Sequence, residues 1–195
     1  MSLGIVYLSM TEQQKYQVLQ SRGNFELRDY APCVVADVVV TGSAEEAGSQ
    51  AFRPLFNYIS GANSSAVSLA MTAPVIQKPN SEKLAMTAPV IQEAAGDEQW
   101  IVSFVLPGDR PLHDYPVPSD SKVTLRQLPQ EVAAALRWSG RWTSSNIAER
   151  TSELQQAIEA EGWHITGDPR WARFDPPWKP PFVRRNEIVI PVRLP

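Results

Sequence analysis

The feature that most constrains the fold of this chain is an internal duplication. Residues 123–140, VTLRQLPQEVAAALRWSG, can be aligned with residues 25–42, FELRDYAPCVVADVVVTG. In each copy, apolar and β-branched residues on both sides of a proline predict two strands, joined in the first copy at Ala31-Pro32. The Leu-Arg pair at 27–28 matches the Leu-Arg pair at 125–126. Two such units favour one shared sheet system with one core.

A helix is expected after the first copy. Ser43 and Glu46 have the spacing of a capping box, and the apolar residues that follow recur at helical spacing until Gly61 ends the helix. Pro54 lies inside this pattern, where it removes one backbone hydrogen bond and clashes with the preceding turn. We therefore expect a kink or a split helix at Pro54.

The second copy is also followed by a helical pattern. Asn146 and Glu149 have capping-box spacing, which predicts that this helix begins at Asn146, and Gly162 ends it. Further strands are expected at 66–77, 84–92 and 99–106 after the first helix, and at 163–174 and 186–193 after the second.

A shorter repeat lies between the two copies. The nine residues LAMTAPVIQ occur at 69–77 and again at 84–92, separated by the turn-forming residues Pro79, Asn80 and Ser81. This arrangement predicts an extended hairpin. The alternative is that the methionines at 71 and 86 form a pair of ligands to a metal or haem, although methionine has a core or surface role far more often.

Composition and charge exclude several classes of function. The chain has 195 residues, of which 43% are apolar, with a formal net charge of -3 and a pI near 5.5. It has no overall basic field, so neither nucleic acid nor an anionic membrane is expected as a partner.

We found no apolar run of about 18 residues and no signal peptide. We expect a soluble monomer, cytoplasmic as given, or periplasmic if a signal peptide was removed. Residues 1–23 are expected to form an N-terminal extension and 24–195 a single domain.

Enzymatic motifs are absent from the sequence. Cys33 is the only cysteine, and its strand-like surroundings indicate a buried thiol, with neither a disulfide nor a thiolate metal cluster. No nucleophile elbow, zinc-protease motif or phosphate-binding glycine loop occurs. A nucleophilic dyad of Cys33 and His164 would require contact between the two side chains, which their separation in the sequence does not indicate. General acid-base catalysis by one of several carboxylates would likewise require contacts that the sequence does not show. We therefore expect neither an enzyme nor a bound metal ion. The carboxylates considered are Asp29, Asp37, Glu45 and Glu46.

Five segments, in order, resemble the SOUL haem-binding protein family. They are FELRDYAPCVVADVVV, AFRPLFNYISGAN, LAMTAPV, WIVSFVLPG and FDPPWKPPFVRRNEIVI, and the resemblance extends from about residue 24 to residue 192. The doubled AMTAPV segment is similar to that of many bacterial members. The resemblance implies an α+β fold: a distorted antiparallel β-barrel of two pseudo-symmetric halves with two packed helices. This fold is similar to that of effector-binding domains in bacterial transcription regulators.

The family resemblance implies a tetrapyrrole-binding function. Members are described as binding haem or porphyrin in a shallow apolar cleft between the first helix and a proline-rich loop, and we expect this chain to buffer or transport such a ligand. Trp178 and Phe182 lie in the corresponding loop, DPPWKPPFVRR, and Lys179 matches the loop lysine to which haem binding is attributed. Haem needs an apolar surface for its ring and cations for its propionates. The expected ligand-binding residues are Phe52, Phe56, Asn57, Trp178, Lys179, Phe182 and Arg184.

Two departures from the family pattern favour weak binding. The cationic positions on the first helix of some animal members correspond to Ser49 and Asn57, and the proposed axial histidine corresponds to Asp29. His113 and His164 are expected to be ordinary polar histidines. We therefore expect haem to bind mainly through apolar contacts, without a strong axial ligand. The alternative is a small-molecule effector-binding or partner-binding module in which haem is incidental.

Overall fold

The structure is a computed structural model that describes residues 13–64, 81–96, 98–108, 110–176 and 178–195. It is an α+β fold with two helices, α1 (Ala44–Ile59) and α2 (Ser144–Ala160), and two short 3-10 helices, η1 (Leu112–Asp114) and η2 (Pro181–Val183). The strands are β1 (Tyr16–Arg22), β2 (Phe25–Tyr30), β3 (Cys33–Thr41), β4 (Asn63–Ser64), β5 (Val90–Gly96), β6 (Gln99–Val105), β7 (Val117–Pro118), β8 (Thr124–Leu128), β9 (Glu131–Trp138), β10 (His164–Ile165), β11 (Arg170–Arg173) and β12 (Asn186–Arg193).

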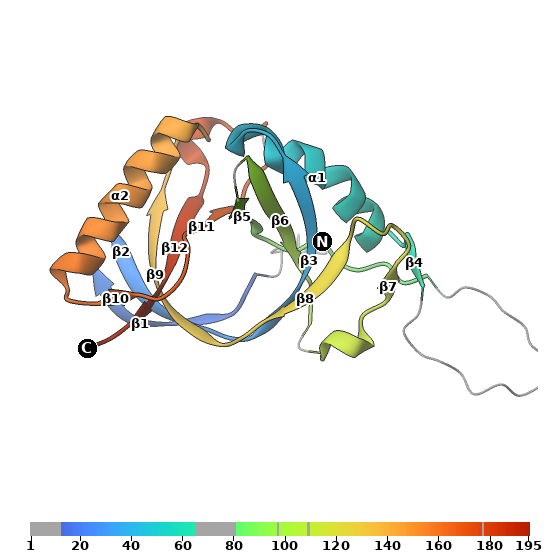
Figure 1. The fold of residues 1–195 in the computed structure, drawn as a ribbon, viewed down its shortest axis with the longest axis horizontal. Helices are drawn as coiled ribbons and strands as arrows, with labels where there is room; N and C mark the ends of the chain where they lie inside the picture. The colour runs from blue at the N-terminus through green and yellow to red at the C-terminus, as the bar shows by residue number, and fades with distance from the viewer. Residues whose placement is uncertain (1–12, 65–80, 97, 109, 177) are drawn as a thin grey trace, which may run out of the picture.

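Most of these strands belong to one large antiparallel sheet (Figure 1). Its order is β1-β2-β9-β12-β11-β5-β6-β3-β8, with β10 paired to β12, while β4 and β7 form a separate two-stranded sheet. Among the described strands, this order begins at β1 and finishes at β8, so the sheet has two edges. The expectation of an α+β fold with an antiparallel sheet and two helices is confirmed. The expectation of a distorted antiparallel β-barrel is not confirmed, because the edge strands β1 and β8 do not pair to close the sheet.

The two sequence copies pair with each other. β2 lies beside β9, and β3 lies beside β8. Tyr30 is opposite Glu131 before the bend at Ala31-Pro32, and Cys33 is opposite Leu128 after it. The pairing register between the two copies is therefore the same on both sides of the bend. The strands joined at Ala31-Pro32 are therefore not partners of one another. They continue in different parts of the sheet.

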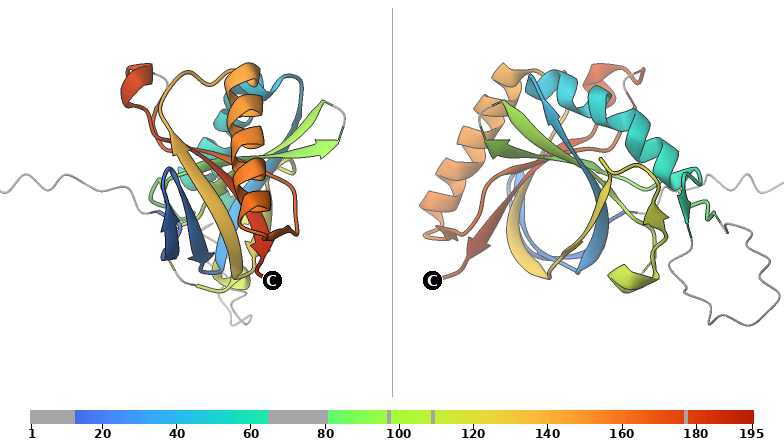
Figure 2. Two further views of the ribbon diagram at one scale, coloured as in Figure 1. Left: turned by 90° about the vertical axis from the view of Figure 1, so that its left-hand side faces the viewer. Right: turned by 45° about the vertical axis from the view of Figure 1, so that its right-hand side comes forward.

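Each half of the sheet is covered by the helix that follows its copy. α1 packs on β3, β6 and β5, and α2 packs on β9 and β12. Outward from the central pair β5-β11, one half continues as β6, β3 and β8, and the other continues as the equivalent strands β12, β9 and β2, followed by the additional strand β1. Both helices lie on the same side of the sheet (Figures 1 and 2). The arrangement is that of two similar halves, as the duplication predicted.

The duplicated Leu-Arg pairs separate the two faces of the sheet. Leu27 is buried in the core beneath α2, and Leu125 packs against the core beneath α1. The following residues, Arg28 and Arg126, point to the opposite face because neighbouring strand residues alternate in direction. We call this face, which carries Tyr30, Val35, Ile91, Leu128, Ala133 and Val189, the inner face.

The ends of α1 agree with the sequence prediction. Ser43 is the N-cap, and its hydroxyl accepts a hydrogen bond from the backbone N–H of Glu46. Gly61 follows the helix with a φ of 111°, which favours glycine. The expected split at Pro54 does not occur, since the helix is continuous from Ala44 to Ile59. The buried residues on both sides of Pro54 keep the two parts of the helix on the sheet.

The start of α2 corrects the sequence prediction. The N-cap is Thr143, whose hydroxyl accepts a hydrogen bond from the backbone N–H of Asn146. Asn146 therefore lies inside the first turn, and the prediction that it begins the helix was wrong. Its side chain donates instead to the carbonyl of Arg141. Sequence spacing alone did not distinguish the two polar residues, because both are favourable at helix starts.

The short repeat does not form the expected hairpin over Val90–Gln92. These residues of the second copy lie in β5, which has β6 on one side and β11 on the other. Neither edge of β5 is therefore open to the first copy. The first copy, with its expected strand at 66–77 and Met71, lies outside the described residues. Met86 is nearly half exposed, so the proposed methionine pair finds no support in the described chain.

The N-terminal segment contributes to the sheet. β1 lies within the segment 1–23 that we expected to precede the domain, and it pairs with β2 along its length. Gln13 forms a bridge to Ala88, just before β5. Among the described residues, neither helix is both long enough and apolar enough to span a membrane.

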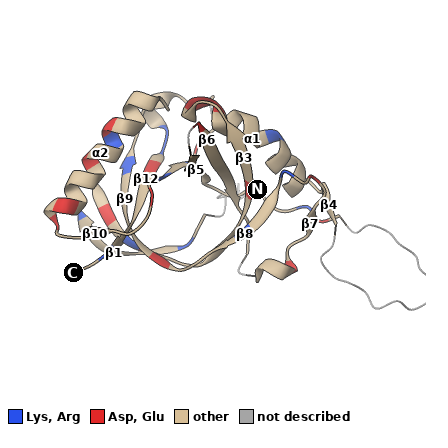
Figure 3. Ribbon diagram, in the orientation of Figure 1, with Lys and Arg blue, Asp and Glu red and all other residues tan. Residues whose placement is uncertain are grey.

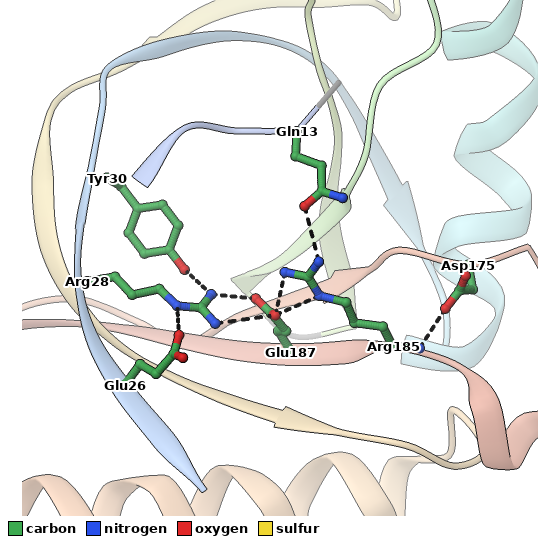
Figure 4. A network of polar contacts seen from close by, with 7 residues as sticks. All are labelled: Gln13, Glu26, Arg28, Tyr30, Asp175, Arg185 and Glu187. Carbon is green, nitrogen blue, oxygen red and sulfur yellow. Dashed lines mark hydrogen bonds and ion pairs between the residues drawn. The ribbon is translucent and has the colours of Figure 1, made fainter. Parts of the chain in front are cut away.

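A buried ionic cluster lies on the inner face (Figure 4). Glu187, which is 1% exposed, accepts hydrogen bonds from Arg28 Nη1 at 2.6 Å and from Arg185 Nε at 2.8 Å. Arg28 also donates to the hydroxyl of Tyr30 at 2.9 Å and to Glu26 at 2.7 Å. Burial by itself would lower the pKa of Arg28, but Glu187 and the other partners outweigh this effect and raise it. Arg28 is therefore held in its charged form, and the cluster links β2 to β12.

We predict that Thr143→Ala lowers the free energy of unfolding by about 1 kcal/mol, because it removes the N-cap of α2. Asn146→Ala should lower it by no more than about 0.5 kcal/mol, because its side chain makes only an exposed contact. Urea denaturation followed by circular dichroism measures both. A larger effect for Asn146→Ala would show that α2 starts where the sequence spacing suggested.

We also predict that Glu187→Gln lowers the free energy of unfolding by about 3 kcal/mol, because it leaves two arginines together without a buried counter-charge. Glu26→Gln is the matched control. The Glu26 side chain is 35% exposed, and we expect its loss to cost less than about 1 kcal/mol. Equal effects of the two substitutions in urea denaturation would contradict a central role for Glu187.

Candidate ligand-binding site

Two of the expected aromatic residues lie on the exposed side of α1. The buried stripe of the helix includes Ala51, Leu55 and Ile59, which face the sheet. Phe52 and Phe56 are each 44% exposed, and their rings stack with centroids 5.6 Å apart. Phe52 also contacts the ring of the buried Phe104 on β6. The exposed pair is therefore held in place by the core and offers a flat apolar surface.

The proline-rich loop between β11 and β12 is organised around Asp175. One carboxylate oxygen accepts a hydrogen bond from Lys179 Nζ at 2.7 Å, and the other accepts from the backbone N–H of Arg185 at 2.6 Å. Burial opposes ionisation of Asp175, but these partners outweigh it and lower its pKa. Arg184 Nε donates to the carbonyl of Lys179 at 2.6 Å. The loop is thus fixed by hydrogen bonds that involve several of its own residues.

Trp178 and Phe182 project from this loop into solvent. They are 83% and 78% exposed, and the adjacent Val183 is 47% exposed. An exposed cluster of large apolar side chains on a fixed loop is typical of a binding surface. The structure therefore agrees with the expectation that these aromatic residues lie outside the core.

The expected cations of the loop have partners within the protein. Lys179 is paired with Asp175, although its side chain is 39% exposed. Arg184 is held at the carbonyl of Lys179, and Arg185 belongs to the buried cluster with Glu187. The polar residues Ser49 and Asn57 are exposed on α1. A ligand carboxylate that approached Lys179 would thus compete with Asp175.

Arg173 connects α1 with the proline-rich loop. Its side chain lies on the helix side of β11, where Nη2 donates weakly to the carbonyl of Ala44 at 3.4 Å. Nη1 would lie 3.2 Å from a Cβ at Gly48, one helical turn before Phe52. Arg173 is also the last residue of β11, so the proline-rich loop follows it directly in the chain. Arg173 was not among the ligand-binding residues expected from the sequence.

The environment of Arg173 is aromatic. Its guanidinium carbon lies 4.1 Å from the centre of the Trp142 ring, and Trp142 stacks with Trp138. Burial lowers the pKa of Arg173 to about 10, and the nearby charge of Glu45 only partly opposes this effect. The Glu45 carboxylate accepts hydrogen bonds from the N–H and hydroxyl of Ser144 at the start of α2. Arg173 is therefore a half-buried cation without an ion-pair partner among the described residues.

The inner face contains two hollows beside the ionic cluster. The larger has about 1020 Å³ of space, part of it open solvent, and the smaller about 390 Å³. Tyr16 and Glu187 line both, and Arg137 lines the larger one. None of the four main hollows among the described residues is lined by any of the seven expected ligand-binding residues. The four aromatic members of that set, Phe52, Phe56, Trp178 and Phe182, are instead exposed.

The candidate axial ligands do not converge on the loop. Asp29 is hydrogen-bonded to Gln130 at the bend between the sheet halves. His113 and His164 are exposed, and His164 lies beyond the C-terminal end of α2, whereas the loop contacts Gly140, before its N-terminal end. Burial raises the pKa of the Cys33 thiol to about 11, which keeps it protonated. Tyr58, whose phenol oxygen is a further type of haem ligand, is buried and donates to the carbonyl of Pro116.

Charges of both signs are spread along the chain (Figure 3). In this view α2 is mainly acidic, since Glu149, Glu153 and Glu159 accompany a single basic residue, Arg150. Arg126, the counterpart of Arg28 in the second copy, lies 2.7 Å from Asp37. Inner-face arginines in both halves are thus neutralised within the protein, in contrast to Arg173 on the helix side.

Comparison with solved structures identifies proteins with the same fold. The C-terminal domain of EcmrR is similar with a TM-score of 0.60, over 91% of this chain and 98% of that domain, at 16% sequence identity. A hydrolase from Listeria innocua is similar with a TM-score of 0.58, over 90% of this chain and 94% of that one, at 15% identity. At such low identity these similarities concern the fold alone. No curated protein matches the sequence.

A family comparison covers nearly the whole sequence. The model of the SOUL heme-binding protein family matches residues 11–191. This range includes both sequence copies, both helices and the proline-rich loop, and it confirms the resemblance seen in the five sequence segments. The chain therefore belongs to the SOUL haem-binding protein family.

Proposed function

We propose that the protein binds haem or a related tetrapyrrole on the helix side of the sheet, between α1 and the proline-rich loop. The observation that carries this proposal is the exposure of Trp178 and Phe182 on a loop fixed by Asp175. Such rings match the large apolar faces of a macrocycle. Phe52 and Phe56 supply a second stacked aromatic surface on α1. Membership of the SOUL family supports this ligand class.

The expected binding mode is apolar contact without a strong axial ligand. His113 lies in η1, which contacts the edge strand β8, and His164 lies beyond the far end of α2. The pKa of the Cys33 thiol is raised. Each of these residues is therefore a poor ligand at this surface. We therefore propose that the protein buffers or carries the tetrapyrrole without changing it chemically. Binding to a surface of this kind allows release to another protein, because no coordinate bond has to break.

We predict that haem saturates the protein near one equivalent, and that Trp178→Ala/Lys179→Ala weakens binding by roughly tenfold or more, because one aromatic contact and one cation are lost. The titration is followed by the absorbance of the haem Soret band. Ile165→Ala/Lys122→Ala is a matched control, since it removes an exposed apolar residue and an exposed lysine elsewhere. An equal loss in both variants, or none in either, would exclude this loop as the site.

The alternative function is binding of a small effector molecule on the inner face. The hollow of about 1020 Å³ beside Glu187 favours it, because it joins aromatic and charged side chains in one place. For a ligand in this hollow, we predict that Arg137→Ala weakens binding while Trp178→Ala/Lys179→Ala has no effect. A thermal-shift screen of small charged and aromatic compounds, repeated on both variants, would separate the two sites.

A further inference from the structure

Three buried N–H donors on the helix side have no acceptor among the described residues. They are Nε of Arg173 and Nε1 of both Trp138 and Trp142. Trp138 is only 8% exposed, and Trp142 contacts both other residues. Buried donors without an acceptor are costly, and most are paired in folded proteins. This small region therefore combines several donors and a cation with a shortage of acceptors.

The nearby carboxylates do not supply that acceptor. Glu45 is engaged by Ser144 at the start of α2, and Asp175 is engaged by Lys179 and the backbone of Arg185. Ala44 offers Arg173 a carbonyl at 3.4 Å, which is a weak hydrogen bond. The charge of Arg184 adds a second positive field close to Arg173. An anionic oxygen from outside the protein is the group that this arrangement lacks.

The position of Arg173 connects it with the proposed ligand surface. It lies against Gly48 on α1, one turn before Phe52, and it directly precedes the proline-rich loop in the chain. Since Gly48 has no side chain, Nη1 reaches a part of the helix that any larger residue would cover. A macrocycle that rests on the aromatic residues has its carboxylates at the edge of the ring, where a cation beside the aromatic surface can bind them.

We propose that Arg173 binds a carboxylate of the tetrapyrrole, at the point where the start of α1 meets Trp142 and the proline-rich loop. This inference rests on the proposed function and adds to it the group that recognises the anionic edge of the ligand. Arg173 suits this role better than Lys179, whose ammonium group already contacts Asp175 at 2.7 Å. A guanidinium can also hold a carboxylate through two parallel hydrogen bonds.

The test compares haem with haem dimethyl ester, in which both carboxylates are esterified, in one detergent-containing buffer. The wild type should bind haem roughly tenfold or more tightly than the ester, and Arg173→Gln should lose about this factor for haem while binding the ester as the wild type does. Arg141→Gln is the matched control, because it removes an exposed arginine of the preceding loop. Its affinity for haem should change less than threefold, or about 0.7 kcal/mol.

A second pair of variants keeps the test valid if Arg173→Gln does not fold. Gly48→Asp would place a carboxylate beside Nη1 of Arg173, where it should compete with the ligand and weaken haem binding by about tenfold. Gly48→Asn has nearly the same shape without the charge and should retain affinity. Circular dichroism and thermal unfolding check that each variant is folded.

The possible results separate the two proposals. If the wild type takes up haem without saturation, as an unrelated acidic protein does, the proposed function itself fails. If the wild type binds haem saturably, but Arg173→Gln is unchanged or loses affinity equally for haem and its ester, only the role of Arg173 is overturned. Equal weakening by Gly48→Asp and Gly48→Asn would overturn it as well, because shape and not charge would be responsible.

Discussion

The structure depends on the pairing of two duplicated segments with each other. Residues 25–41 and 124–138 run antiparallel in one register through the bend at Ala31-Pro32, so each copy provides strands to both halves of the sheet. Neither copy could complete its half alone, because β2 needs β9 and β3 needs β8 as neighbours. The two helices can then cover equivalent strands, β3 and β6 beneath α1 and β9 and β12 beneath α2, and each helix closes a core cluster of its own.

This pairing also separates two electrostatic environments. Alternation along the duplicated segments places Leu27 beneath a helix and Arg28 on the inner face, where Glu187 neutralises it. The second copy repeats this arrangement with Arg126 and Asp37. The helix side differs in that its arginine is not neutralised. Arg173 lies there next to Trp142 and has no ion-pair partner among the described residues. The sheet thus keeps a neutralised cluster on one face and a half-buried cation on the other.

The proposed binding surface is formed where the two halves meet. Phe52, Phe56 and Gly48 belong to α1 of the first half, whereas Trp142, Arg173 and the proline-rich loop belong to the second. β5 and β11, the central strands, bring these elements together. A ligand at this junction would contact elements fixed by the core and a loop fixed by Asp175. Little conformational entropy would then be lost on binding, which favours even a shallow site.

Much of this architecture could be predicted from local sequence. The duplication indicated two strands in each copy and one shared sheet. The capping residue Ser43 and the glycines at 61 and 162 marked helix ends, and the prolines around Trp178 indicated exposed aromatics. These features depend on backbone conformation and on alternation of polar and apolar residues, which neighbouring residues control. The family was recognisable for the same reason, since its motifs are short continuous segments.

Other features were decided only by the tertiary structure. Spacing did not show that β5 has partners on both sides, which excludes the expected hairpin at Val90–Gln92, nor that Thr143 precedes Asn146 as the cap. It did not distinguish Lys179, which is paired with Asp175, from Arg173, which is not. The physical reason is that strand partners and ion pairs join residues far apart in the chain. Which charges are neutralised and which remain available to a ligand is therefore determined by packing across the two halves, and the sequence alone determined only the units that pack.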